Sequence, residues 1–157
     1  MEYNQKWNFP KMQPWAVYDS IVTSEGMLVI PQDCLTGMFL DGTTVVLTNS
    51  LDKGAIALYT PNAFDDVKSN LGCLNSMDRM ARALKMRIIG EALDIKINKG
   101  NIEIPAEYME SLGLSFEQTA SRNHTSFNVK ILKYPEKIEI YTIAAYQNIR
   151  FETENVE

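Results

Sequence analysis

The stretch that decides the fold is Gly100-Asn101-Ile102-Glu103-Ile104-Pro105, and Gly26-Met27-Leu28-Val29-Ile30-Pro31 follows the same plan earlier in the chain. Each segment is a glycine, four residues and a proline, and the two lie 74 positions apart. Glycine accepts the positive φ that a tight turn between strands requires. In the later segment the two isoleucines alternate with polar residues, as in a strand with one buried face. The recurrence predicts an internal duplication.

The match between the two halves extends beyond these segments. Ile21 aligns with Ile95 at the same offset, and further on the offset grows to 82, so that Tyr59 aligns with Tyr141. The extra residues fall in the polar stretch 116–126, which we interpret as a longer loop. Because each unit alone is too small to bury much surface, we expect the two units to share one interlocked core.

Each unit is expected to run strand, turn, strand, short helix, strand, strand, helix. The expected strands are 21–23, 28–30, 43–47, 55–59, 95–97, 102–104, 127–133 and 138–142. Short helices are expected at 32–36 and 106–111, and Thr60-Pro61 should begin a longer one. Another helix is expected at 76–89, with an apolar stripe that should be buried. That stripe is Met77, Met80, Ala81, Leu84 and Ile88.

The composition of the 157 residues, with 45% hydrophobic and 22% charged, is typical of a soluble globular protein. No apolar run approaches the roughly 20 residues that span a bilayer, and the first six residues do not resemble a signal peptide. The formal net charge of −5 argues against broad binding of polyanions but not against a local basic face. Cys34 and Cys73 are expected to be reduced thiols, with a disulfide as the alternative.

The order and spacing of these elements resemble the SpoVT/AbrB swapped-hairpin unit. Two such units separated by two helices resemble the MraZ family of bacterial transcriptional regulators. The best-matching segment is 104–114, Ile-Pro-Ala-Glu-Tyr-Met-Glu-Ser-Leu-Gly-Leu, and 87–92 is similar to the family's helix end before the second unit. The resemblance implies an α+β, mostly β fold. It would be a pseudo-twofold double swapped-hairpin AbrB-like barrel with short helices and two helices between the repeats.

This reading divides the chain into five parts. They are an aromatic N-terminal extension (1–17), a first AbrB-like unit (18–67), a connecting helical segment (68–92), a second AbrB-like unit (93–149) and an acidic tail (150–157) that should fray. In the extension, Trp7 and Trp15 are expected to pack on the domain surface or on a neighbouring subunit. An aromatic box that binds a ligand is the alternative.

The resemblance implies a cytoplasmic, nucleoid-associated DNA-binding regulator, a homo-oligomer that presents its hairpin turns to repeated sites on double-stranded DNA. The family carries the motif Asp-x-Lys-Gly-Arg at each turn, at positions matching 23–27 and 97–101 here. Both turns keep the glycine, whereas Met27 and Asn101 replace the arginine and Glu25 replaces the first lysine. These replacements favour an alternative function, an oligomeric protein-interaction scaffold of the same fold that has lost DNA binding.

The candidate DNA-binding residues belong to the two turns and to the basic helix before the second unit. They are Lys96, Asn98, Lys99, Asn101, Ser24, Met27, Arg79 and Arg82. Six of the fifteen lysines and arginines lie between positions 79 and 99. The basic segment is either a solvated helix face or an anion-binding surface.

An enzyme is not expected. The lone histidine, His124, falls in the polar insertion, and no His-Glu-x-x-His, phosphate-loop or dinucleotide motif occurs. Asp65 and Asp66 are adjacent on an expected helix, so their side chains diverge and do not form a carboxylate pair. The sequence therefore predicts no catalytic residue, metal, cofactor, small-molecule substrate or membrane partner.

Overall fold

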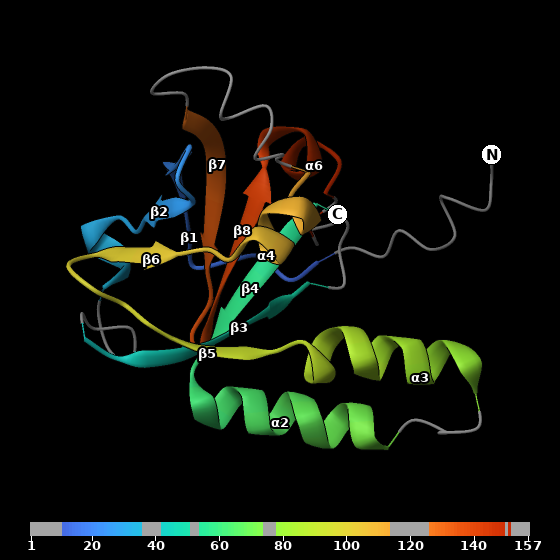
Figure 1. The fold of residues 1–157 in the computed structure, drawn as a ribbon. Coiled ribbons are helices and arrows are strands. Elements are labelled where there is room, and N and C mark those ends of the chain that lie inside the picture. Colours follow the sequence, from blue (N-terminus) through green and yellow to red (C-terminus); the bar gives the residue numbers. More distant parts are fainter. Residues whose placement is uncertain are drawn as a thin grey trace, which may run out of the picture.

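The computed structural model describes residues 11–35, 42–50, 54–73, 78–113, 126–149 and 151. Strands dominate the fold, which is α+β. Eight antiparallel strands form one sheet that curls into a nearly closed barrel, and a few short helices lie around it (Figure 1). The expected fold class, α+β and mostly β, is confirmed at this level.

The same order of elements runs through both halves. The strands are β1 (Ala16–Thr23), β2 (Met27–Val29), β3 (Thr44–Asn49), β4 (Ala55–Tyr59), β5 (Leu93–Lys96), β6 (Asn101–Glu103), β7 (Ser126–Lys133) and β8 (Lys137–Thr142). The helical segments are η1 (Gln32–Cys34), α2 (Pro61–Gly72), α3 (Arg79–Lys85), the π-helical turn η3 (Met86–Gly90), α4 (Ala106–Ser111) and α6 (Ile143–Gln147). The strands β2 to β8 and the helix 106–111 lie within two residues of their predicted positions, whereas β1 begins at Ala16, inside the expected extension 1–17 and five residues before the predicted strand 21–23.

The strand order is β5-β3-β4-β8-β7-β1-β2-β6, in which β4 of the first half pairs with β8 of the second. β1 of the first half pairs with β7 of the second along its whole length, from Ala16↔Lys133 to Thr23↔Ser126. In the same way β5 of the second half pairs with β3 of the first. The first strand of each half is therefore hydrogen-bonded to the third strand of the other, so neither half keeps its sheet without its counterpart.

One hydrophobic core fills the barrel, and both halves contribute to it. Its buried members include Val22, Leu28, Ile30, Val45, Leu47, Ile56, Leu58, Ile97, Ile102, Ile104, Met109, Val129, Ile131, Ile138 and Ile140. Alternate residues of the strands point into this core, while the other faces of β3, β4, β7 and β8 are covered by two smaller hydrophobic clusters. The expectation of one shared core is confirmed.

The helices that follow β4 and β8 begin in the same way. Thr60 caps α2, because its Oγ1 accepts a hydrogen bond from Ala63 N at 3.2 Å, and Pro61 stands at the first helical position, as predicted. Thr142 caps α6 through Ala145 N at 3.1 Å. The two helices thus occupy corresponding places after the paired strands β4 and β8.

The prediction of a helix over 76–89 is confirmed for the described residues 79–89, but the prediction that its methionine stripe is buried is wrong for Met80. α3 ends at Lys85, and the chain continues as the π-helical turn η3. Met80 is 77% exposed, while Ala81 and Ile88 are buried as predicted, and Met77 lies outside the described residues. At the π-helical turn, Thr48 Oγ1 of β3 donates to the carbonyl of Ile88 at 2.5 Å. Such side-chain bonds satisfy carbonyls of the widened turn.

The two ends of the described chain meet, so the expectation that the tail frays from position 150 is wrong for Phe151. Phe151 forms a parallel β-bridge with Lys11, and its ring lies 6.2 Å from that of Tyr146. Trp15 stays 71% exposed, with the Lys133 ammonium 5.7 Å from its ring. Trp7, His124 and the insertion 116–125 lie outside the described residues.

Candidate functional site

The two hairpin turns at 23–27 and 97–101 have different backbones. In the first, Gly26 takes a φ of 91°, and its N–H donates to Thr23 O at 2.9 Å. In the second, Lys99 and Gly100 both have positive φ, 55° and 77°. Two successive positive φ values are the pattern of a type I′ turn, which favours asparagine or glycine over lysine. Lys99 is therefore held in a conformation that a lysine rarely adopts.

Pairing between β2 and β6 fixes the positions of these turns. Leu28 lies opposite Ile102, and beyond the ladder Ile104 N donates to Gly26 O at 2.8 Å and Ile30 N to Gly100 O at 2.9 Å. Because the strands are antiparallel, the turns lie at opposite ends of the ladder. At about 3.3 Å per residue they are about 13 Å apart. The four predicted positions 96, 98, 99 and 101 share the second end.

The two ends of this ladder differ in charge. The first turn carries the exposed Glu25, and the exposed Glu103 pairs with Met27 beside it. The second end carries the exposed side chains of Lys96 and Lys99. One edge of the barrel therefore has an acidic end and a basic end.

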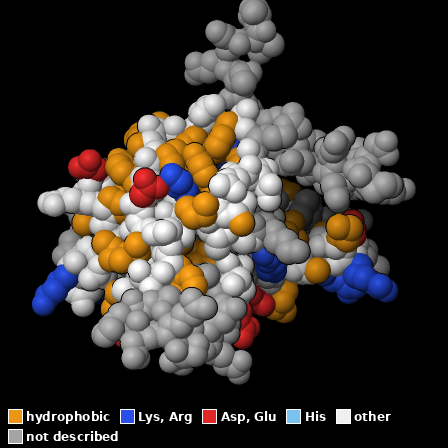
Figure 2. All heavy atoms as spheres, turned by 90° about the horizontal axis from the view of Figure 1, so that it is seen from above, with side chains coloured by type: hydrophobic (Ala, Val, Ile, Leu, Met, Phe, Trp, Pro, Cys, Tyr) orange, Lys and Arg blue, Asp and Glu red, His pale blue; other side chains and the backbone are white. Residues whose placement is uncertain are grey.

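The structure separates the other predicted residues from the second turn. Ser24 and Met27 are half-buried at the acidic end. Arg79 and Arg82 are exposed on α3, which with α2 projects from the side of the barrel away from β2 and β6 (Figure 1). Figure 2 shows basic side chains at opposite edges of the molecule, over α3 and over the β5–β6 turn. The eight candidates thus form three groups and not one surface.

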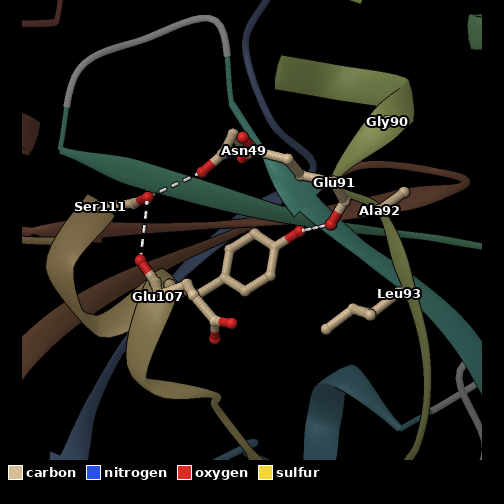
Figure 3. Close-up of a pocket in the computed structure, with 8 residues that line it drawn as sticks. Asn49, Gly90, Glu91, Ala92, Leu93, Glu107 and Ser111 are labelled. Carbon is tan, nitrogen blue, oxygen red and sulfur yellow. Dashed lines mark hydrogen bonds between the residues drawn. The ribbon is translucent and has the colours of Figure 1, made fainter. Parts of the chain in front are cut away.

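A pocket that the sequence analysis missed lies between the end of β3, the η3–β5 connection and α4 (Figure 3). Its volume is about 420 Å³, and its lining residues are Asn49, Gly90, Glu91, Ala92, Leu93, Glu107, Tyr108 and Ser111. These residues come from three separate parts of the sequence, each of ordinary composition. No motif could have indicated the pocket, because only the pairing of β5 with β3 brings the parts together.

A hydrogen-bond network fixes the wall of this pocket. Asn49 is 4% exposed; its Nδ2 donates to Glu91 Oε1 at 2.9 Å, and its Oδ1 accepts from Ser111 Oγ at 2.8 Å. The Tyr108 hydroxyl donates to the carbonyl of Glu91. Burial, followed by the charges of Glu91 and Glu107, raises the pKa of Tyr108 to about 12. The buried side of the pocket is therefore rigid, and its potential is negative.

A charged cluster around Glu139 of β8 holds the N-terminal segment on the barrel. Glu139 is 3% exposed; its carboxylate lies 3.0 Å from Lys11 Nζ and 2.9 Å from Lys137 Nζ. Tyr141 donates its hydroxyl to the same carboxylate at 2.9 Å. Each charge has an opposite partner, as a buried ionised group requires, so the cluster is a structural anchor.

The described part of the chain contains no group of three or more metal-ligating side chains. None of its helices combines the length and the apolar character needed to cross a lipid bilayer. Comparison with protein-family models gives no match, and comparison with curated proteins gives no significant one.

Proposed function

We propose that the protein is a MraZ-like DNA-binding transcriptional regulator that contacts double-stranded DNA through its second hairpin turn, as a homo-oligomer in the cytoplasm. The single observation that carries the proposal is the turn itself, where Lys99 is exposed at the tip and flanked by Lys96 and Asn98. Lysines grip phosphate, and asparagine can read adenine in the major groove. A narrow type I′ hairpin is slim enough to enter that groove.

The strand pairing supports the finer proposal about the fold, a pseudo-twofold double swapped-hairpin AbrB-like barrel. The β1–β2 hairpin belongs to the first half but pairs with β7, and the β5–β6 hairpin belongs to the second half but pairs with β3. If two repeats exchange their first hairpins, each hairpin pairs with the other repeat in this way. In such a barrel both hairpin turns lie on one edge, at the two ends of the β2–β6 ladder.

Oligomerisation is part of the proposal because one turn offers little charge. Two lysines per chain neutralise about two phosphates, which gives weak binding at physiological salt. Several copies on one duplex raise the affinity through effective concentration without any new contact. The proposed regulator therefore depends on assembly, with each copy adding one basic turn.

The alternative is an oligomeric protein-interaction scaffold of the same fold without DNA binding, and a specific observation favours it. The acidic end with Glu25 and Glu103 and the basic end with Lys96 and Lys99 lie on one edge of the barrel. The acidic end of one copy is complementary to the basic end of the next. Such a head-to-tail contact builds rings or filaments.

The test is titration of labelled DNA duplexes at several salt concentrations, read by fluorescence anisotropy. Lys99→Asn removes the positive charge, and the asparagine that it introduces tolerates the positive φ of this position. We expect weaker binding and a salt slope lower by about 0.9 for each turn in contact. Lys68→Gln on α2 is the matched control and should leave the slope unchanged.

Wild-type affinity no better than millimolar at about 50 mM salt would contradict DNA binding. The same holds if the two variants have equal slopes. Light scattering then tests the scaffold: Glu25→Lys should reduce the oligomer mass if acidic and basic ends join, and a strictly monomeric wild type contradicts both functions.

A further inference from the structure

The pocket between β3, the η3–β5 connection and α4 has a polar wall that is already assembled. Asn49 uses both sides of its amide, and its Nδ2 also donates to the carbonyl of Arg87 at 3.1 Å. A residue that is 4% exposed and bonded in three directions cannot turn away when a ligand arrives. The wall therefore pre-exists, which lowers the entropy cost of binding.

The charge lining the pocket has one sign. Its charged lining side chains are the carboxylates of Glu91 and Glu107, both on exposed residues. Figure 3 shows the Glu107 carboxylate and the Leu93 side chain facing each other across the space. Ala92 and Leu93 supply apolar surface next to the carboxylates. An anionic ligand would be repelled, whereas a cation with an apolar stem matches both surfaces.

The acidic character of the pocket is found in one half of the barrel only, and the equivalent place in the other half does not share it. Asn49 lies opposite Ile56 in the β3–β4 pair, and Lys133 lies opposite Ile138 in the corresponding β7–β8 pair. Lys133 thus occupies the position equivalent to Asn49, and there it is 7% exposed. The corresponding places in the two halves therefore carry different chemistry.

We propose that the pocket binds a small organic cation with a primary ammonium or guanidinium group on a short apolar stem. The ammonium would pair with the carboxylate of Glu107, and the stem would pack on the Leu93 side chain that faces it (Figure 3). A pocket of about 420 Å³ lies within the range of small-molecule sites. The aromatic ring of Tyr108, fixed by its hydroxyl, offers a further attraction for a cation.

The position of the pocket gives such a ligand a mechanical role. Leu93 begins β5 and α4 follows β6, so the pocket touches both ends of the hairpin that carries Lys99. A bound cation would join these ends and restrain the hairpin. The binding site itself does not depend on the proposed contact with DNA, so either one can fail without the other.

The experiment is calorimetry combined with a two-dimensional NMR titration of the full chain, with putrescine and agmatine as probes. We expect saturable binding, with amide shifts concentrated at 90–93 and 107–111. Glu107→Gln should weaken binding about tenfold, because a charge-assisted contact is lost. Glu110→Gln, on the same helix but outside the pocket lining, should bind like the wild type.

Two further compounds separate charge from shape. Butane-1,4-diol has the stem of putrescine without its charge, and succinate has the opposite charge; neither should bind. Absence of saturable putrescine binding up to about 10 mM would overturn the proposal. Equal losses in the two glutamine variants would also overturn it, because the net charge of −5 would then explain the attraction. Urea unfolding of both variants confirms that each is folded.

Discussion

The backbone N–H of Ile104 donates to the carbonyl oxygen of Gly26 at 2.8 Å, and this contact brings the end of one hairpin against the turn of the other. A Cβ atom on Gly26 would stand 2.9 Å from the carbonyl oxygen of Ile104. At the corresponding Gly100, the nearest atom is a Leu35 methyl carbon at 3.7 Å. The two glycines hold equivalent places in the sequence, yet only Gly26 is confined by a neighbouring backbone.

Alanine at these glycines should therefore have unequal effects. Both substitutions put a side chain at positive φ, which costs roughly 1–2 kcal/mol. Gly26→Ala also forces the β2–β6 ladder apart, so we expect a total loss of about 2–4 kcal/mol in the free energy of unfolding. Urea denaturation measures both losses. Equal losses would mean that the close approach at Gly26 is unimportant.

The ion pair of Lys11 should anchor the N-terminal segment. Lys11→Met removes one of the two lysines that contact the buried Glu139, so we expect a loss of about 1–3 kcal/mol and faster proteolysis near residue 11. Lys130→Met is the control, because its partner Asp19 has a side chain that is 82% exposed. A loss at Lys130 as large as that at Lys11 would contradict the anchoring role.

Alkaline pH should destabilise the protein through two buried acids. Burial raises the pKa of Cys34 from 9.0 to about 11 and that of Tyr108 from 10.0 to about 12. The unfolded chain loses these protons first, so the stabilisation is complete below pH 9 and is lost as pH rises towards 12. Urea midpoints from pH 7 to pH 11 should fall above pH 9. The urea midpoint of the Tyr108→Phe variant should fall less steeply above pH 10 than that of the wild type.

Thiol labelling checks the burial of Cys34 independently. Cys73 is exposed and Cys34 is buried. At pH 8 in native conditions, an aromatic disulfide reagent should modify Cys73 alone, and Cys34 should react only in urea. Rapid native labelling of a Cys73→Ser variant would show that the core around η1 opens readily.

The two faces of the α3–η3 segment should respond differently to substitution. Met80→Gln changes a side chain that is 77% exposed and should alter the free energy of unfolding by less than about 0.5 kcal/mol. Ile88→Ala removes a buried side chain from the cluster with Val46 and Phe64 and should cost about 2–4 kcal/mol. Similar costs at both positions would place Met80 in an interface.

The sequence by itself determined the elements and their duplication. The Gly-to-Pro segments, the alternation of Ile102 and Ile104, and the Thr60-Pro61 helix start are local signals, because turn geometry, strand periodicity and capping act within a few residues. The helical period of apolar residues, which is also a local signal, wrongly predicted that Met80 is buried. A period of 3.6 identifies a stripe on a helix, but it does not say whether another element covers that stripe.

Tertiary structure alone decided which residues share a site. The pairing of β2 with β6 places the turn with Glu25 and the turn with Lys99 at opposite ends of one ladder. The pairing of β5 with β3 brings Asn49 next to Glu91. α3, which begins at Arg79, and the β5–β6 turn, which carries Lys99, lie on opposite sides of the molecule, although only 20 positions separate the two residues (Figure 1). Contacts between distant parts depend on strand pairing across the two halves, and that pairing is set by burial of the whole core rather than by any local pattern.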